Sequence, residues 1–315
     1  MKNRLFLTTF LEEKKKKIIK FYDKTADSKF FIAFGPILWM ILFFILPLFI
    51  VLKISLSESV FNLPPYTEVF SMTKDYLLHI DLNFKNYVFL FKDWYYRHAF
   101  LNSLLLSTFS TFFCLVIGYM MAYAMSSMRE TTRSILILFI SLSFWTSFLI
   151  RVYSWMNLLS VHGVVNSFLM RIGFIDSPIH FIGNYYAICG GMVFCYLPFM
   201  IFPIYSALEK MDKSYIEASY DLGCSPTKTF WLITIPLSKY GIISGCILVF
   251  SASIGEFVVP ELLGGADSIT VGRVLWNEFF NNLDWPMACA LSIVMSIFIV
   301  CPIFFFQKNN EKEKE

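Results

Sequence analysis

Six long apolar segments constrain the fold of this chain more than any other feature of its sequence. They cover residues 30–52, 99–125, 134–150 with an extension to 159, 185–207, 240–255 with an extension to 260, and 286–306. About 20 apolar residues in a helix cross the hydrocarbon layer of a bilayer, so each segment is long enough to span it. The composition agrees, because 57% of the residues are hydrophobic and only 16% are charged. We therefore predict an all-α integral membrane protein with six transmembrane helices.

The basic residues predict how these segments are oriented. If the N-terminus is cytoplasmic, 18 Lys and Arg lie in the cytoplasmic segments and six in the external ones. This distribution follows the positive-inside rule, so we expect both termini in the cytoplasm. The expected layout is a basic cytoplasmic tail (1–29), a six-span transmembrane domain (30–306) with a cytoplasmic loop at 208–239, and a charged cytoplasmic tail (307–315). The first apolar segment lacks a small-residue cleavage site and is expected to be an anchor, not a signal peptide.

A polar block interrupts the apolar pattern inside the loop 208–239. From Ser214 to Pro236 it reads SYIEASYDLGCSPTKTFWLITIP. Ser214 and Glu217 have the spacing of a capping box, and Gly223 stands where a left-handed helix stop is expected. The block therefore predicts a short helix over 215–222, followed by a second amphipathic stretch. Because an isolated helix of this length is marginal in water, we expect it to pack against something.

The same block resembles the E-A-A…G…I-x-L-P loop of ATP-binding-cassette importer permeases. The match runs through residues 217–219, Gly223, Ile233 and Pro236, with Ser219 in place of the second Ala and Ile235 in place of Leu. In that family the segment is a coupling helix that inserts into a cleft on an ATPase subunit. The resemblance implies an ATPase-coupling surface, for which the candidate residues are Ser214, Glu217, Ala218, Ser219, Asp221, Gly223 and Pro236.

Further stretches resemble the spermidine/putrescine permease subunits of bacteria. They are SFWTSFLIRVYSW (143–155), GFIDSP (173–178), LPFMIFPIYSALEKMDK (197–213) and the text from Gly255 to Pro286. The resemblance implies a type I importer of polyamine in the bacterial inner (plasma) membrane. Its expected partners are two copies of an ATPase subunit, a second homologous permease subunit and an external polyamine-binding protein. That protein would dock on the external segments 55–97, 160–184 and 261–285, and no nucleic acid is involved.

The sequence contains no motif for hydrolysis. It has no G-x-x-x-x-G-K-[ST] loop to hold ATP phosphates, no H-E-x-x-H and no G-x-S-x-G. Its four histidines lie in predicted external segments without metal-site spacing, and its seven cysteines are interpreted as small apolar packing residues. We therefore expect no catalytic residue, no metal site and no cofactor in this chain, with ATP and magnesium bound by the partner ATPase.

Glu256 is an ionisable residue that the pattern places in the outer half of the fifth predicted span. Such a residue is a candidate for function by default. Polyamines are handled by carboxylates and aromatic faces, so the substrate-path candidates are Trp145, Arg151, Tyr153, Trp155, Glu256, Asp284 and Trp285. A structural interpretation stays open beside this one. In it, Arg151 pairs with Glu256 or Asp284 as a buried ion pair, and the tryptophans form an interfacial belt.

Two other functions fit parts of the sequence. The first is an ATP-binding-cassette permease for another small solute, such as a sulfate-like anion or an oxidised metal chelate. Arg151 favours an anion, and Glu256 argues against it. The second is an ATP-independent channel or secondary carrier, which gives no reason for the spacing between Ser214 and Pro236.

Overall fold

The computed structural model describes residues 33–60, 62–67, 70–72, 78–80, 82–265 and 268–312. The predicted basic tail at 1–29 and the end of the predicted tail at 307–315 lie outside these residues. The chain forms two compact units, Met1–Ile54 and Ser55–Glu315. Each unit is described by itself below.

The described part of the first unit is one apolar helix, Ala33–Ser55, whose last residue already belongs to the second unit. It contains a π-helical turn, η1 (Ile41–Ile45), which continues into α2 (Leu46–Ser55). Residues 33–50 are all exposed, although the segment is apolar on every side. A helix that is hydrophobic all round is typical of a membrane span, which agrees with the first predicted span.

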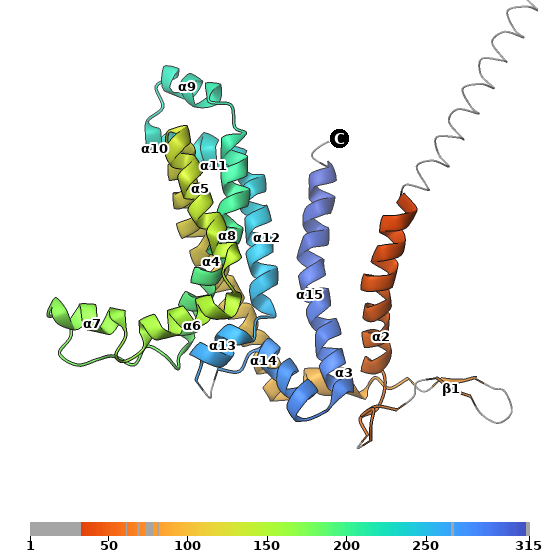
Figure 1. Cartoon of the computed structure of the whole chain (residues 1–315). Coiled ribbons are helices and arrows are strands. Elements are labelled where there is room, and N and C mark those ends of the chain that lie inside the picture. Colours follow the sequence, from red (N-terminus) through yellow and green to blue (C-terminus); the bar gives the residue numbers. More distant parts are fainter. Residues whose placement is uncertain are drawn as a thin grey trace, which may run out of the picture. The chain divides into compact units, whose positions relative to one another are not determined.

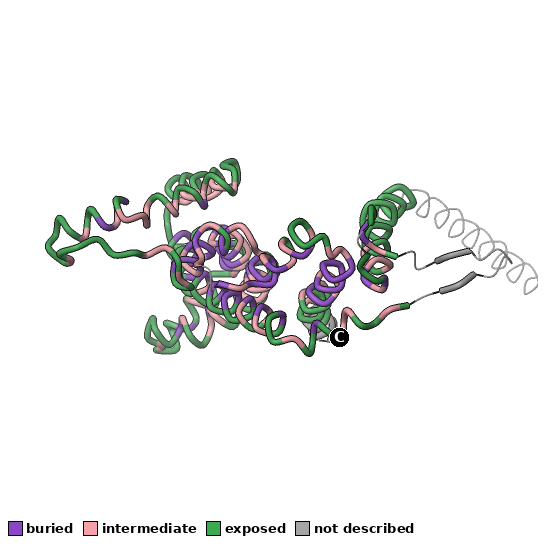
Figure 2. The backbone as a smooth tube through the Cα atoms, turned by 90° about the horizontal axis from the view of Figure 1, so that it is seen from below, coloured by how far each residue is buried: buried purple, intermediate pink, exposed green. Residues whose placement is uncertain are grey.

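Three long helices form the core of the second unit. They are α4 (Trp94–Ser127), α8 (Tyr185–Glu209) and α12 (Lys239–Ile254), and they pack along one another (Figure 1). Figure 2 shows that the buried residues gather inside this bundle. Small residues allow the close approach of the helices. A Cβ atom on Gly241 would lie 2.7 Å from the carbonyl oxygen of Pro203, and one on Gly245 would lie 2.7 Å from Sδ of Met200.

The short helix α9 (Ser214–Asp221) lies at one end of the bundle, with α10 (Pro226–Thr229), the π-helical turn η2 (Phe230–Thr234) and α11 (Ile235–Leu237) (Figure 1). We call this the α9 end. The opposite end, here the α6 end, carries α6 (Phe148–Leu159), α7 (Val164–Arg171), α13 (Val258–Leu263), α14 (Val271–Trp276) and η3 (Asn277–Asn281). The helices α3 (Lys85–Lys92) and α15 (Trp285–Lys312) meet there as well, since α15 contacts α3 and η3. The strands β1 (Phe70–Met72) and β2 (Leu78–Ile80) form an antiparallel pair, with Phe70 opposite Ile80.

The described residues contain five helices that are long and apolar enough to cross a membrane. They are Ala33–Ser55, Trp94–Ser127, Phe148–Arg171, Tyr185–Glu209 and Trp285–Phe304. A sixth span is present if Pro226–Leu237 and Lys239–Ile254 are one span, bent by 65°. The helical membrane fold is therefore confirmed.

The third predicted span, 134–150 with an extension to 159, is wrong in its boundaries. Its helix is α5 (Glu130–Trp145), which packs on α8 through Phe144 and Phe199, with ring centroids 5.1 Å apart. The chain is extended at Thr146, whose hydroxyl donates a hydrogen bond to the carbonyl of Ser143 and so competes with the helical bonds. Beyond this break α6 runs across the end of the bundle, packed on α8 and α13, and α7 leads away from it (Figure 1). We assign the span to α5, although Phe148–Arg171 is the longer apolar helix, because α5 contacts α8 near both of its ends, through Arg133 and Glu209 and through Phe144 and Phe199.

The extension of the fifth span to residue 260 is also wrong. The helix α12 ends at Ile254, and the next helix begins only at Val258. Pro260 lies in the first turn of α13, where its missing N–H costs no hydrogen bond. Glu256 therefore lies in a break between two helices and not inside a span.

Candidate coupling site and the carboxylate at the helix break

The helix α9 begins at a cap that differs from the predicted one. The carboxylate of Asp212 accepts a hydrogen bond of 2.9 Å from the backbone N–H of Ser214. Among the described residues no hydrogen bond joins Ser214 to Glu217, so the capping box predicted for these two residues is not formed. The bonds from Ser214 hold the pKa of the exposed Asp212 carboxyl below its ordinary value. Asp212 therefore stabilises the start of α9 in its charged form.

The end of α9 is the one that the sequence predicts. Gly223 has φ of 79°, in the left-handed region. The N–H of Gly223 donates to the carbonyl of Tyr220 at 2.9 Å, and the N–H of Cys224 donates to the carbonyl of Ser219 at 3.0 Å. This pair of bonds is a Schellman motif, which satisfies the last carbonyls of the helix. It turns the chain back toward α10.

A buried hydrogen bond joins α9 to α10. The hydroxyl oxygens of Ser219 and Thr229 lie 2.8 Å apart, and both side chains are buried. Ser219 also donates to the carbonyl of Ile216 at 2.7 Å. Because that bond uses the only hydroxyl hydrogen of Ser219, Thr229 is the donor in the pair. The two short helices are thus packed on each other, as the marginal stability of an isolated helix requires.

The bend between α11 and α12 is fixed to α4. Ser238 lies at the bend, is fully buried, and its hydroxyl lies 3.1 Å from the hydroxyl of Tyr119. The ring of Phe230 packs edge-on against Tyr119 at 5.6 Å and Tyr123 at 5.2 Å between centroids. The segment from α9 to α11 is therefore connected to the end of α4 by aromatic packing and one buried hydrogen bond.

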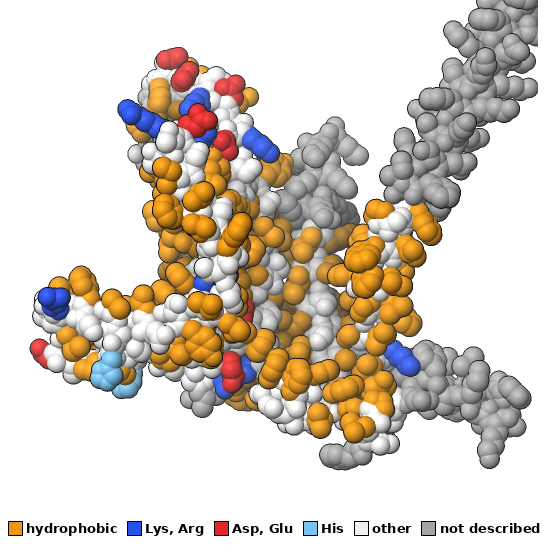
Figure 3. Space-filling view, viewed as in Figure 1, with side chains coloured by type: hydrophobic (Ala, Val, Ile, Leu, Met, Phe, Trp, Pro, Cys, Tyr) orange, Lys and Arg blue, Asp and Glu red, His pale blue; other side chains and the backbone are white. Residues whose placement is uncertain are grey.

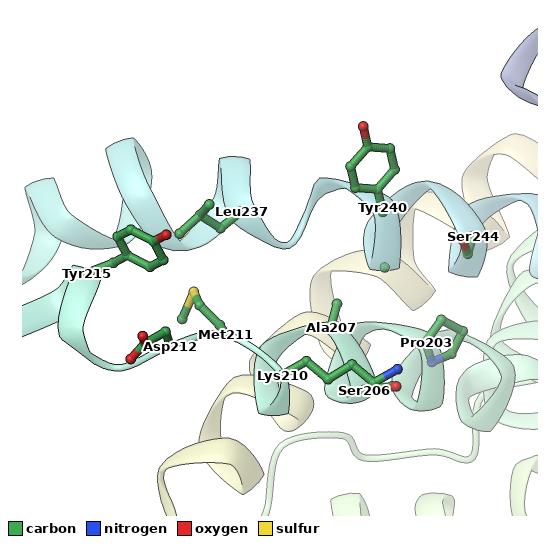
Figure 4. A pocket seen from close by; sticks show the side chains of 11 residues that line it. Pro203, Ser206, Ala207, Lys210, Met211, Asp212, Tyr215, Leu237, Tyr240 and Ser244 are labelled. Carbon is green, nitrogen blue, oxygen red and sulfur yellow. The ribbon is translucent and has the colours of Figure 1, made fainter. Parts of the chain in front are cut away.

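A cavity of about 640 Å³ separates the end of α8 from α9 and the start of α12 (Figure 4). Met211 and Asp212 line it from one side, and Leu237 and Tyr240 from the other. The ring of Tyr215 points toward Leu237 at one end of the cavity. The cavity leaves α9 in contact with the bundle mainly through α10 and η2.

The structure brings the predicted coupling residues together on one exposed helix. Ser214, Glu217, Ala218 and Asp221 are exposed on α9, and Gly223 follows at its end. Ser219 differs, because it is buried against Thr229. Pro236 is exposed but lies apart from them, in α11. Figure 3 shows that acidic and basic side chains gather over the α9 end, whereas the bundle below it is mostly hydrophobic.

Glu256 is held at the break between α12 and α13 by hydrogen bonds from two helices. Its carboxylate accepts from the backbone N–H of Val258 at 2.8 Å and of Val259 at 3.4 Å. The hydroxyl of Tyr196, in the middle of α8, donates to the other carboxylate oxygen. Glu256 thus caps α13 and connects it to α8 across 60 residues of sequence.

The ion pair considered between Arg151 and Glu256 or Asp284 is not formed in the described part of the chain. Arg151 donates instead to the hydroxyl of Ser143 at 3.3 Å and to the carbonyl of Cys195 at 3.2 Å. Cys195 is the neighbour of Tyr196, so one short stretch of α8 holds both Arg151 and Glu256. Of the seven substrate-path candidates, Arg151 and Glu256 are brought near each other, and Trp155 reaches the same stretch of α8 by stacking on Phe194.

The remaining substrate-path candidates are spread over the α6 end. Trp145 is exposed and Tyr153 is half exposed, whereas Trp155 stacks on Phe194 at 5.2 Å between ring centroids. Asp284 accepts from the N–H of Met287 at 3.1 Å and caps α15. Trp285 stacks on Phe279 at 5.1 Å between centroids. These residues share one end of the bundle but do not form one site.

Comparison with known proteins establishes the family. Residues 28–312 match the family described as binding-protein-dependent transport system inner membrane component. The chain belongs to this family. It is therefore a multi-pass component of an inner membrane, in agreement with its apolar helices.

Individual relatives of this inner membrane component are similar over most of its length. It is 35% identical over 275 residues to the spermidine/putrescine transport system permease protein PotB of Haemophilus influenzae, covering 87% of this chain and 91% of that protein. It is 36% identical over 261 residues to PotB of Escherichia coli, and the match covers 82% of this chain and 89% of that protein. A bacterial alginate ABC transporter, solved in complex with an alginate pentasaccharide-bound periplasmic protein, has the same fold. Its TM-score is 0.70 at 17% identity, and the match covers 90% of this chain and 93% of that one.

Several residues that organise this inner membrane component were not among the predicted site residues. They are Asp212, Thr229, Ser238, Tyr119 and Tyr196. Asp212 could have been found, because an acid two residues before a short helix is a common cap. Tyr196 and Thr229 carry no such signal, since their partners lie on other helices.

Proposed function

We propose that this chain is a transmembrane permease subunit of an ATP-driven importer of polyamines such as spermidine and putrescine. The observation that carries the proposal is the identity of about one third, over more than four fifths of the chain, to spermidine/putrescine permease proteins. In the proposed topology both termini and the α9 end are cytoplasmic, because this places 18 of the 26 basic residues inside. The α6 end then faces the outside.

The helix α9 is the proposed coupling helix. Its residues Glu217, Ala218 and Asp221 are exposed and therefore available to a cleft on an ATPase subunit. ATP and magnesium are bound by that subunit, since this sequence has no phosphate-binding loop of its own. Two ATPase copies are expected, one for this chain and one for a second homologous permease that completes the path.

An external polyamine-binding protein is the proposed donor of cargo. It docks on the segments 55–97, 160–184 and 261–285, which the proposed topology places outside. The alginate transporter, which shares this fold, was solved with its periplasmic protein bound, and this supports the same type of assembly here.

Glu256 and Arg151 are the proposed charges beside the substrate path. The carboxyl group of Glu256 lies next to α8, where it accepts a hydrogen bond from Tyr196, and a carboxylate attracts ammonium groups. Trp145, Tyr153, Trp155, Asp284 and Trp285 remain weaker candidates, because most of them cap or pack a helix. A permease for an anionic solute is the second possible function, and the observation that favours it is the positive charge of Arg151 beside the Cys195 carbonyl of α8.

Reconstituted transport tests the proposal. The chain is co-expressed with its second permease, its ATPase and its binding protein, and the complex is placed in proteoliposomes with ATP inside. We expect uptake of labelled spermidine or putrescine that requires ATP and the binding protein. The ATP-independent alternative is favoured instead if uptake continues without ATP under an imposed membrane potential. Competition by sulfate but not by polyamines would favour the anionic cargo.

A further inference from the structure

Residues 146–184 form an arm that leaves the bundle sideways at the α6 end. In this segment α6 packs across the end of the bundle on α8 and α13, and α7 continues away from the bundle (Figures 1 and 2). We call this segment the lateral arm. The proposed docking of the binding protein involves residues 160–184 of this arm, but it does not identify what covers the hydrophobic side of α7.

Both ends of the lateral arm are fixed at the end of a bundle helix. The arm follows Trp145, the last residue of α5, and returns at Tyr185, the first residue of α8. Trp145 is 88% exposed, and Tyr186 is 89% exposed. Exposed Trp and Tyr at the ends of membrane helices are typical of the boundary between hydrocarbon and water. The arm therefore leaves and re-enters the bundle at the level of the bilayer surface.

The lateral arm has a fixed internal structure. The side chain of Asn166 is fully buried; it donates to the carbonyls of Ser160 at 3.1 Å and Ile179 at 2.9 Å, and it accepts from the N–H of Ile179 at 2.9 Å. The helix α7 ends in a second Schellman motif, in which Gly173 has φ of 72°. These hydrogen bonds hold α7 in place within the arm without contact to the core. They therefore fix which side of α7 faces outward.

That outer face is hydrophobic. Val164, Phe168 and Ile172 follow one another at intervals of four residues and are 71%, 62% and 58% exposed, and the nearby Phe174 is 78% exposed. Residues four apart lie on one side of a helix, so these side chains form one stripe. Ser167 and Arg171 are exposed along the edge of the stripe. Arg171 makes no ion pair or hydrogen bond through its side chain to any residue that the structure describes.

We propose that the lateral arm lies in the membrane surface, with this stripe inserted into the lipid leaflet at the α6 end. In the proposed topology this is the outer leaflet. An amphipathic helix in this position buries its apolar side at the boundary of headgroups and acyl chains, and its basic residues meet lipid phosphate. The bilayer is the chosen occupant because both ends of the arm lie at its surface, and because Arg171 at the edge of the stripe complements anionic headgroups. The arm anchors the end of α5 and α8 in the plane of the membrane.

Spin labels on neighbouring residues test this position. The assembled transporter is placed in nanodiscs of phosphatidylethanolamine and phosphatidylglycerol, in a Cys301→Ser background because Cys301 is the exposed cysteine of the described residues. Phe168→Cys places a label on the stripe. Ser167→Cys is the matched control, since the next residue points about 100° away around the helix. Val164→Cys repeats the test on the same stripe if one variant fails to assemble.

Collision of each label with oxygen, which is enriched in lipid, is compared with collision with a water-soluble nickel chelate. We expect oxygen to dominate at Phe168 and Val164, and the ratio of oxygen to nickel collision to be several-fold lower at Ser167. If the ratio of oxygen to nickel collision is the same at all three positions and collision with nickel dominates, the arm lies in water and the proposal is overturned. A label at Phe168 that neither reagent reaches would overturn it as well, because the stripe would then be covered by protein.

Discussion

Ser219 and Thr229 join the two short helices α9 and α10 through one buried hydrogen bond of 2.8 Å. Ser219 stands where the importer motif has its second Ala, so this chain has a hydroxyl at a position that is otherwise apolar. The hydroxyl is matched by Thr229, ten residues further along. The departure from the motif is therefore compensated inside the same loop.

Ser219→Ala is expected to loosen the packing of α9 on α10. The variant leaves the buried Thr229 hydroxyl without its acceptor, which costs about 1–3 kcal/mol. Amides of α9 should then exchange with solvent roughly tenfold faster, since about 1.4 kcal/mol is a factor of ten. Hydrogen exchange with mass spectrometry on the complex measures this. Thr229→Val should cost less, because Ser219 keeps its bond to Ile216. Equal exchange in Ser219→Ala and the parent would contradict the prediction.

Gly223→Ala is expected to lower cargo-stimulated ATP hydrolysis. No atom lies within 4 Å of the added Cβ, so the variant has room, and only the left-handed backbone at φ of 79° opposes it. That conformation costs roughly 1–2 kcal/mol for a residue with a Cβ. Gly223→Asn is the control, because Asn tolerates the left-handed conformation better. We expect the stimulation of ATP hydrolysis by cargo to be highest in the parent, lower in Gly223→Asn and lowest in Gly223→Ala. Identical stimulation in all three proteins would argue against a role for this turn.

Glu256→Gln is expected to weaken polyamine uptake about tenfold while the complex still assembles. The Gln oxygen still accepts from the N–H of Val258, but the negative charge is lost, and a hydrogen bond to a charged group is worth roughly 1.5–3 kcal/mol. Uptake is measured together with the yield of assembled complex. Glu256→Ala serves as the comparison, since it removes the cap of α13 and should reduce assembly as well. Equal loss of assembly in Glu256→Gln would show that the carboxylate is only structural.

Gly191→Ala is expected to destabilise the packing of α8 against α13. The added Cβ would lie 2.5 Å from Cδ1 of Leu263 and 3.1 Å from Cγ1 of Val259, and both side chains are fully buried. Overpacking of this kind costs about 1–3 kcal/mol. Thermal unfolding in detergent measures it, with Gly35→Ala as control, because no atom lies within 4 Å of that Cβ. Equal unfolding midpoints for the two variants would count against the close contact.

Asp212 is expected to protect the first turn of α9 at every pH used for transport. Its pKa is lowered from 3.8 by the bonds from Ser214. The stabilisation is therefore fully present above the unfolded pKa and is lost as the pH falls through the lowered, folded value. Amide exchange in this turn, corrected for the intrinsic rate, should stay constant from about pH 5 to 8. Asp212→Ala should lose the protection, and Asp212→Asn should keep most of it. If protection of these amides from exchange rises between pH 5 and 8, the lowered pKa of Asp212 is contradicted.

The sequence was sufficient to predict the membrane fold and the short helix that ends at Gly223. Apolar segments of span length and a glycine at a helix stop are local signals, and both are confirmed. The sequence does not predict the helix breaks after Trp145 and Ile254. An apolar segment has the same pattern of residues whether its helix continues or is interrupted. The start of α9 was predicted with the wrong cap, since Asp212 and Ser214 are both good capping residues and only the structure distinguishes them.

The candidate site was harder to predict than the fold. Glu256 was singled out correctly as an ionisable residue among apolar ones, but its partners were expected to be charged. The structure gives it Tyr196 and two backbone N–H groups instead. A tyrosine on an apolar helix is an ordinary packing residue in a single sequence, so no local pattern indicates that it faces a carboxylate 60 residues away.

The bend at Ser238 determines how displacements pass along the chain. Pro226–Leu237 and Lys239–Ile254 meet at 65°, which is closer to a right angle than to a straight line. The first segment is tied to α9 by Thr229, and the second lies along α8 and α4. A push along the axis of the first segment is therefore mostly a sideways push on the second. In the proposed mechanism, a displacement of α9 along this axis would therefore move α12 sideways within the membrane.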